Sequence, residues 1–166
     1  MEDYLSMKFE PLIPEYDAAI AKLIRISLKA HHLDIPGTVY FDEGLDHLSD
    51  FYNQPSRAYY VLLDEGNLIG GIGLAEFTGF PDCCELQKLY LDESYKGQRL
   101  GYGMIEYIER KARKLGYRRI YLETHTNLQA AIHIYERSGY QEIARPESVV
   151  HSTMNKFYLR ELSETL

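Results

Sequence analysis

The stretch "CELQKLYLDESYKGQRLGYGMIEYIERKARKLG", from Cys84 to Gly116, joins a strand-like segment to a long helical one through a glycine-rich junction. Apolar residues recur at helical spacing after the junction, which predicts a helix over 100–115. Gly97, Gly101 and Gly103 stand where this helix begins. The first N–H groups of a helix lack partners and carry partial positive charge, and glycines let a ligand approach them closely. The junction therefore predicts a site for an anionic group such as a phosphate.

A simpler interpretation of the junction is a turn softened by glycines, with Lys96 and Arg99 exposed to solvent. The same two side chains supply positive charge suited to a pyrophosphate, so the loop alone leaves both interpretations open. The P-loop pattern is absent from the junction, and so is the dinucleotide fingerprint. Gly71-Ile72-Gly73 lies in a predicted strand that belongs to a hairpin, so it is not that fingerprint either.

Periodicity and turn residues divide the rest of the chain into short elements. The predicted strands cover 8–12, 58–63, 68–77, 84–91, 119–124, 140–144 and 156–162. The predicted helices cover 15–30, 41–51, 100–115 and 128–138. The order is β-α-α-β-β-β-α-β-α-β-β, which predicts an α/β (α+β) fold: a mixed, mostly antiparallel sheet of about seven strands flanked by helices. It is not the repeated β-α alternation of a Rossmann domain.

Length and charge limit the classes of function. The chain has 166 residues and no linker-like segment, which predicts a single domain over 1–166. The formal net charge is −7, and no cluster of basic residues offsets it, so nucleic acid is not an expected partner. No apolar run approaches the roughly 20 residues that span a membrane, and the N-terminus has no signal-peptide pattern. We therefore expect a cytoplasmic protein without a membrane partner.

The metal-binding residue types show no ligand pattern. Cys83 and Cys84 are the only cysteines, and neighbours on a strand point to opposite faces, so we expect two reduced thiols. None of the six histidines has ligand spacing with a carboxylate or cysteine. We expect no metal site.

Two segments together resemble the GNAT N-acetyltransferase superfamily. The stretch quoted above is similar to its acyl-CoA-binding core, and "YLETHTNLQAAIHIYERSGYQEI", from Tyr121 to Ile143, is similar to the segment that follows. The family loop reads Arg/Gln-x-x-Gly-x-Gly/Ala and fits in two registers. The register 98–103 matches by residue type, whereas 96–101 matches by spacing after the strand. We prefer the second, in which Lys96 replaces the usual Arg/Gln and Arg99 replaces a usual Gly.

The resemblance implies acetyl-CoA as the co-substrate. The main chain of Gly97 to Tyr102 would cradle its pyrophosphate, and the backbone of Leu89 to Leu91 would pair with the pantetheine arm as an added strand. Asn127 stands one place before the position where the family often has an asparagine, and it also lies in a Thr126-to-Gln129 capping box. The residues assigned to the cofactor are Leu89, Tyr90, Leu91, Lys96, Gly97, Gln98, Arg99, Leu100, Gly101, Tyr102, Gly103 and Asn127.

Acetyl transfer to an amine needs a base, an oxygen donor and a proton for the leaving thiolate. Tyr135, in "YERSGY", matches the family tyrosine that faces the sulfur of CoA. Glu85 is our candidate for the base, directly or through water, because it begins the strand that would hold the pantetheine. Glu123 is its rival and His125 a weaker third. By resemblance, the oxygen donor is the Leu89 N–H.

The resemblance predicts an N-acetyltransferase that moves an acetyl group from acetyl-CoA to a primary amine of a small molecule or peptide, by direct attack in a ternary complex. The alternative is a non-catalytic acyl-CoA-binding sensor or interaction module on the same fold. The acceptor site would be built by 33–52, 78–83 and 146–153. Homodimer formation stays open. Because side chains alternate along a strand, we expect Glu85, Gln87 and Leu89 to share one face, and the polar Glu85 and Gln87 favour a solvated crevice over a packed helix on that face.

Overall fold

The computed structural model describes residues 7–97 and 99–162. One sheet runs through the molecule in the order β1-β2-β3-β4-β5-β7-β6. Its strands are β1 (Met7–Pro11), β2 (Ala58–Asp64), β3 (Asn67–Phe77), β4 (Cys83–Leu91), β5 (Arg119–Thr124), β6 (Gln141–Ile143) and β7 (Lys156–Glu161). Every neighbouring pair is antiparallel except β4 and β5. The predicted mixed, mostly antiparallel sheet of seven strands is confirmed.

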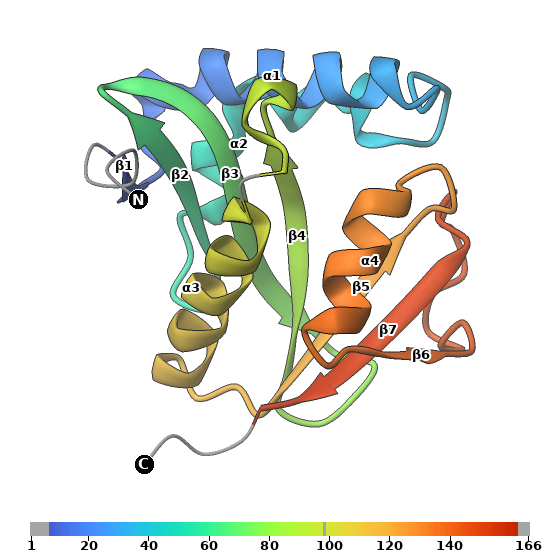
Figure 1. Cartoon of the computed structure of the whole chain (residues 1–166). Helices are drawn as coiled ribbons and strands as arrows, with labels where there is room; N and C mark the ends of the chain where they lie inside the picture. Colours follow the sequence, from blue (N-terminus) through green and yellow to red (C-terminus); the bar gives the residue numbers. More distant parts are fainter. Residues whose placement is uncertain (1–6, 98, 163–166) are drawn as a thin grey trace.

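The parallel pair β4 and β5 is joined at one end only. Their register covers Cys83–Glu85 against Arg119–Tyr121, and beyond Glu85 the strand β4 continues to Leu91 without a partner on that side. Figure 1 shows the two strands diverging from the lower end of the sheet. Beyond Glu85 the sheet is therefore split into two halves, β1-β2-β3-β4 and β5-β7-β6, and the edges β4 and β5 face a gap between the halves.

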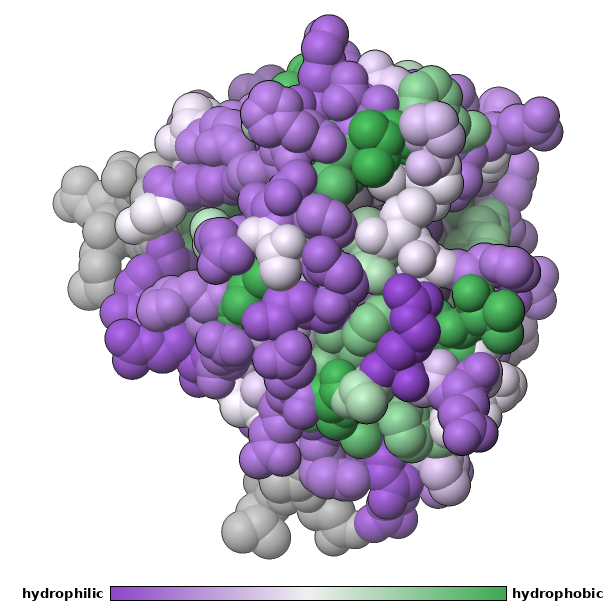
Figure 2. Space-filling model, turned by 90° about the vertical axis from the view of Figure 1, so that its right-hand side faces the viewer, coloured by the Kyte–Doolittle hydropathy of each residue, from purple (hydrophilic) through white to green (hydrophobic). Residues whose placement is uncertain are grey.

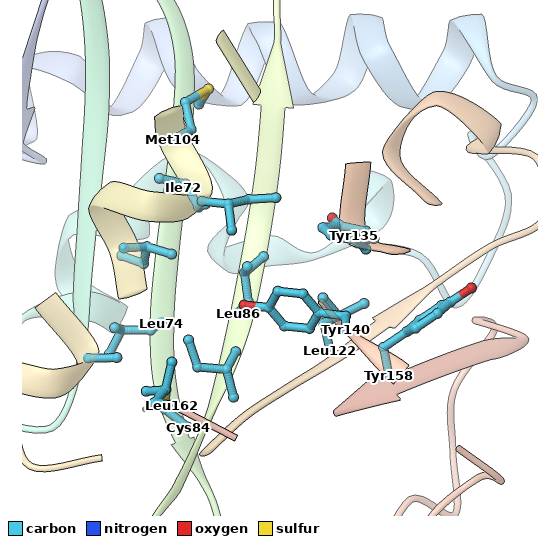
Figure 3. Close-up of a cluster of buried hydrophobic side chains, with 14 of the residues drawn as sticks. Ile72, Leu74, Cys84, Leu86, Met104, Leu122, Tyr135, Tyr140, Tyr158 and Leu162 are labelled. Atoms are coloured by element: carbon cyan, nitrogen blue, oxygen red, sulfur yellow. The ribbon is translucent and has the colours of Figure 1, made fainter. Parts of the chain in front are cut away.

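Helices cover both faces of the sheet. They are α1 (Asp17–Ala30), α2 (Leu48–Tyr52), α3 (Leu100–Lys114) and α4 (Gln129–Arg137). Helices α3 and α4 lie on one face, over β3–β4 and β5–β7 respectively, and they share one large apolar core with residues of those strands (Figures 1 and 3). The helices α1 and α2 pack with Val61, Leu63 and Tyr59 in a second core on the other face.

Two local expectations are wrong. The predicted helix 41–51 is instead a pair of 3-10 turns, Val39–Phe41 and Glu43–His47, followed by the short helix α2. Asp42 between the turns has extended backbone (ψ 130), and Gly44 follows it, so a continuous helix is interrupted before it can propagate. The capping box at Thr126 is also absent: α4 begins at Gln129 behind Leu128, whose side chain makes no capping hydrogen bond.

A β-bulge in β4 overturns the expected alternation of its side chains. Lys88 has a positive φ of 52°, and the register with β3 passes from Gln87 opposite Gly73 to Tyr90 opposite Gly71. Leu89 consequently packs with Leu86 on the α3 side, whereas Gln87 contacts α2 on the other side. Glu85, Gln87 and Leu89 do not share one face, because the extra residue shifts the alternation by one position.

No helix among the described residues is long and apolar enough to cross a lipid bilayer. The prediction of a single domain over 1–166 stays a prediction.

Candidate active site

A cavity of about 790 Å³ fills the gap between the two halves of the sheet. Its walls come from β4, β5, the first turn of α3, one side of α4, the C-terminal end of α1, and the loop at 151–154. It exists because β4 and β5 stop pairing at Glu85, so the backbone of 86–91 borders empty space instead of another strand. A sheet edge of this kind offers unpaired N–H and C=O groups to an extended ligand.

One end of the cavity is bordered by the first turn of α3. Leu100, Gly101 and Tyr102, whose N–H groups precede the first intrahelical hydrogen bonds, all line the cavity. Arg99, the residue before the helix, has a left-handed backbone (φ 64°) and lies over the Tyr102 ring at 5.3 Å. A Cβ on Gly101 would come within 2.8 Å of Ile134 on α4, so glycine lets the two helices approach here. This end combines helix-terminal N–H groups with a basic side chain.

The C-terminal end of α1 is tied to both sides of the cavity. The ring Nε2 of His31 lies 3.4 Å from the Lys96 ammonium and 3.5 Å from Glu93, which itself pairs with Lys96 at 2.8 Å. The carbonyl oxygen of His31 accepts a hydrogen bond from the Asn127 side chain at 3.1 Å. Asn127 is therefore engaged with α1 and does not line the cavity, in contrast to its assignment as a cofactor contact.

The loops that follow α1 and β6 meet over the cavity. The Thr153 hydroxyl donates to the Gly37 carbonyl oxygen at 3.3 Å, and both residues line the cavity. Figure 2 shows the face of the molecule that contains these loops, where apolar patches interrupt a polar surface. Ile35 and Val150, one from each loop, are 43% and 72% exposed, so apolar side chains from both loops contribute to that surface.

Tyr59 supports the bulge of β4 from two strands away. Its ring crosses β3 above Gly71 and Gly73, where an added Cβ would come within 2.4 Å of Tyr59 atoms. Its hydroxyl then donates to the Lys88 carbonyl oxygen at 2.7 Å. Gly71 and Gly73 in strand β3 are thus explained by the space that Tyr59 needs to reach β4. The sequence analysis did not identify this residue, although the unusual glycines were a visible signal.

Glu85 stands where the pairing of β4 and β5 ends, and it lines the cavity. The pKa of Glu85 is raised from 4.5 to about 7: burial is the largest cause, the nearby Glu123 also raises it, and a hydrogen bond from Gln87 opposes both. The Gln87 amide donates to Glu85 Oε1 at 3.0 Å and accepts from the Tyr52 hydroxyl at 2.7 Å. A carboxylate with a pKa near 7 is suited to take and release protons at neutral pH.

The two rivals for the base are already engaged. Glu123 lines the cavity, but one of its oxygens accepts from the Tyr121 hydroxyl at 2.9 Å and the other from Ser152 at 2.8 Å. His125 does not line the cavity, and its Nδ1 accepts the Asn127 N–H at 3.0 Å. Of the three candidates, Glu85 is the best placed to act as the base: it lines the cavity, and among the described residues only Gln87 donates a hydrogen bond to its carboxylate.

Tyr135 reaches the cavity from α4. It is 5% exposed and packs against Tyr140 and Tyr158, with ring centroids 6.0 Å and 6.4 Å away (Figure 3). Its hydroxyl makes no hydrogen bond to another described residue, while the residue itself lines the cavity. Burial raises the pKa of this hydroxyl, so it stays protonated at neutral pH. A phenol of this kind is available to donate a proton.

The cavity brings together most of the residues predicted from the sequence. Those that line it are Glu85, Leu89, Tyr90, Leu91, Lys96, Gly97, Arg99, Leu100, Gly101, Tyr102 and Tyr135. Gly103 does not line it, and Gln98 lies outside the described residues. Of the predicted acceptor segments, 78–83 does not border it; Phe80 and Cys83 instead pack in a separate cluster with Tyr121 and Phe157.

Comparison with known proteins identifies the family. Residues 25–140 match the model of the family described as "Acetyltransferase (GNAT) family". An Escherichia coli (strain K12) protein described as "Uncharacterized N-acetyltransferase YjgM" is 39% identical over 127 residues, which cover 75% of this chain and 76% of the relative.

Solved structures have the same fold. An acetyltransferase of the GNAT family from Staphylococcus aureus Mu50 superimposes with a TM-score of 0.82 at 20% identity, over 95% of this chain and 99% of that chain. YncA from Salmonella typhimurium, described with its cofactor acetyl-CoA, superimposes with a TM-score of 0.75 at 17% identity, over 96% of each chain. On the match over residues 25–140 and the E. coli relative, the chain belongs to the GNAT acetyltransferase family and is an acetyltransferase.

Proposed function

We propose that this enzyme transfers the acetyl group of acetyl-CoA to a primary amine of a small molecule or peptide, by direct attack in a ternary complex. One observation carries the proposal: a single cavity is lined by the first turn of α3, by the unpaired edge of β4, and by Glu85 and Tyr135. The E. coli relative is named as an N-acetyltransferase, which supports nitrogen as the acceptor atom.

Acetyl-CoA would enter along the unpaired edge of β4. The N–H groups of 100–102 and the side chain of Arg99 are suited to the pyrophosphate, because a helix N-terminus and a guanidinium both attract anions. The backbone of Leu89 to Leu91 is suited to pair with the pantetheine arm as a strand would. The acetyl-CoA in the YncA structure, on the same fold, supports this co-substrate.

The chemistry follows from Glu85 and Tyr135, two of the titratable groups on the cavity wall. Glu85 takes a proton from the acceptor ammonium, directly or through water, and the neutral amine attacks the thioester carbonyl carbon. Lys88 and Leu89 have no register partner on β3, which supports the Leu89 N–H as a donor to the carbonyl oxygen. The carbon–sulfur bond then breaks, and Tyr135 gives its proton to the leaving thiolate. The attacking nitrogen loses its extra proton as the amide forms, and that proton returns Tyr135 to its neutral form through water. The products are an N-acetyl amine and free CoA.

Steady turnover tests the proposal. Acetyl-CoA is incubated with the enzyme and a panel of amines, amino acids and peptides, and CoA release is followed by thiol detection. We expect acceptor-dependent release at a rate well above that of hydrolysis. Acetyl-CoA binding without acceptor-dependent release from any member of the panel would instead support the non-catalytic sensor.

A further inference from the structure

Lys88 occupies an unusual place at the acceptor end of the cavity. The bulge at Lys88 turns its side chain to the side of β4 that faces α2, where the Phe51 and Tyr52 rings lie 5.7 Å and 5.9 Å from its ammonium. Lys88 lines the main cavity and also a second cavity of about 500 Å³, which is formed by 41–51. The ammonium therefore stands where the two cavities adjoin.

The Lys88 ammonium has no ionic partner in the part of the chain that the structure describes. Among residues 7–97 and 99–162, no carboxylate pairs with Lys88, whereas Lys96 and Lys156 each pair with a glutamate. Burial lowers the pKa of Lys88, and the attraction of Asp42 and Glu85, both beyond contact distance, opposes that effect. A desolvated cation without a partner costs folding free energy, so packing alone does not explain a lysine here.

The aromatic rings do not replace an ionic partner. Both lie close to the 6 Å limit at which a cation interacts with a ring face, where the attraction is weak. A methionine would fill the same space beside Phe51 and Tyr52 without the cost of a buried charge. The charge itself is what remains to be explained.

We propose that Lys88 binds the carboxylate of an acceptor that carries an amine and a carboxylate on one small molecule, such as a free amino acid. The proposal rests on the acetyltransferase function proposed above, and it specifies the class of acceptor. Glu85 and Lys88 belong to the same segment of β4 and border the same cavity. An acceptor with two opposite charges places its amine at Glu85 and its carboxylate at Lys88. Each side chain then has an oppositely charged partner on the acceptor.

The proposal separates two classes of amine. A polyamine has a second positive charge, which Lys88 repels, whereas an amino acid has a negative one, which Lys88 attracts. Matched acceptors that differ only in the carboxylate are lysine and cadaverine, ornithine and putrescine, and phenylalanine and phenethylamine. The kinetic constants for each pair are measured with the wild type, with Lys88→Met and with Lys88→Arg. Lys114→Met, which changes an exposed lysine on α3, is the matched control.

We expect the wild type to prefer the carboxylate member of at least one pair. Lys88→Met raises the KM for that member roughly ten- to a hundredfold, the usual effect of losing a charged contact. It leaves the KM for phenethylamine unaffected and lowers the KM for the diamines cadaverine and putrescine, whose second positive charge is no longer repelled. Lys88→Arg retains most of the preference, and Lys114→Met retains all of it. A melting temperature at or above the wild-type value and an unchanged response to acetyl-CoA show that the Lys88→Met variant is folded.

A preference for the decarboxylated members, or a carboxylate preference that survives Lys88→Met, overturns the inference and leaves the acetyltransferase function intact. Calorimetry with the CoA-loaded enzyme separates the remaining cases. If no amine is acetylated but amino acids bind in a Lys88-dependent manner, the inference stands and the proposed function fails. If amino acids are neither acetylated nor bound, both are overturned.

Discussion

Gln87 donates a hydrogen bond to the Glu85 carboxylate, and Tyr52 fixes the direction of that bond. The Tyr52 hydroxyl donates to Gln87 Oε1 at 2.7 Å, so the amide nitrogen of Gln87 points to Glu85 Oε1 at 3.0 Å. A donor to a carboxylate favours its charged form, and this bond opposes the rise in the pKa of Glu85 that burial causes. Gln87 is therefore a positioning residue that also tunes the candidate base.

The first prediction concerns the loss of the Gln87 amide as a donor to Glu85. Gln87→Leu raises the pKa of Glu85, so the acidic limb of the pH profile of kcat/KM moves upward by roughly 1–2 pH units, the equivalent of one hydrogen bond to a charged group. Tyr52→Phe moves it in the same direction by less, because the amide stays but is free to rotate. An acidic limb that keeps its wild-type position in Gln87→Leu would remove Gln87 from this role.

The second prediction concerns Glu85 as the base. Glu85→Gln lowers turnover most near pH 7 and less near pH 9, where more of an amine with a pKa near 10 is already neutral. The rate is followed by CoA release at both pH values. A loss that does not shrink as the pH rises means that Glu85 positions the acceptor. No loss at either pH transfers the base role to Glu123 or to water.

The third prediction is that the same substitution stabilises the fold at high pH. The pKa of Glu85 is raised from 4.5 to about 7, so the fold favours the protonated form, and stability is lost as the pH rises between these values. Glutamine carries no charge, so the free energy of unfolding of Glu85→Gln should exceed that of the wild type by about 1–3 kcal/mol at pH 8. The two should not differ near pH 4.5. Urea unfolding at the two pH values measures this difference. Equal stabilities at pH 8 would contradict a buried, destabilised carboxylate.

The fourth prediction concerns Tyr135. Tyr135→Phe removes the hydroxyl and keeps the ring packed between Tyr140 and Tyr158. We expect turnover to fall roughly ten- to a thousandfold with little change in CoA affinity, because only the proton for the thiolate is lost. Tyr158→Phe is a matched control, because the hydroxyl that it removes donates to Glu136 at 2.9 Å. Equal turnover in Tyr135→Phe and the wild type would return Tyr135 to a packing role.

The fifth prediction separates charge from size at the α3 N-terminus. Gly101→Ala adds a methyl group that meets the flexible end of Ile134, so the acetyl-CoA-induced rise in melting temperature should persist in reduced form. Gly101→Asp adds negative charge where the phosphates would bind, and the rise should disappear. If both variants lose the rise equally, the effect comes from α3–α4 packing and not from a phosphate site.

The sequence by itself determined the order of the elements and the location of the α3 junction. Periodicity defines α3 and β5 well because local spacing determines both, and Gly116 ends α3 with a φ of 92°, as expected of a glycine at a helix end. The segment 41–51 was predicted wrongly because its apolar spacing is also compatible with 3-10 turns, and the interruption at Asp42 depends on packing against α1.

Only the tertiary structure decided how the site is assembled. The bulge at Lys88 depends on Tyr59, which lies 29 positions earlier in the chain and reaches β4 across β3, so no local pattern around Lys88 reveals it. That bulge sends Leu89 to one face and keeps Gln87 on the other. Asn127 likewise bonds to His31 because the C-terminal end of α1 lies beside the loop between β5 and α4, a contact between residues 96 positions apart. The sequence determines which side chains a strand carries, but bulges and contacts with neighbouring strands determine the face of the sheet on which each side chain lies.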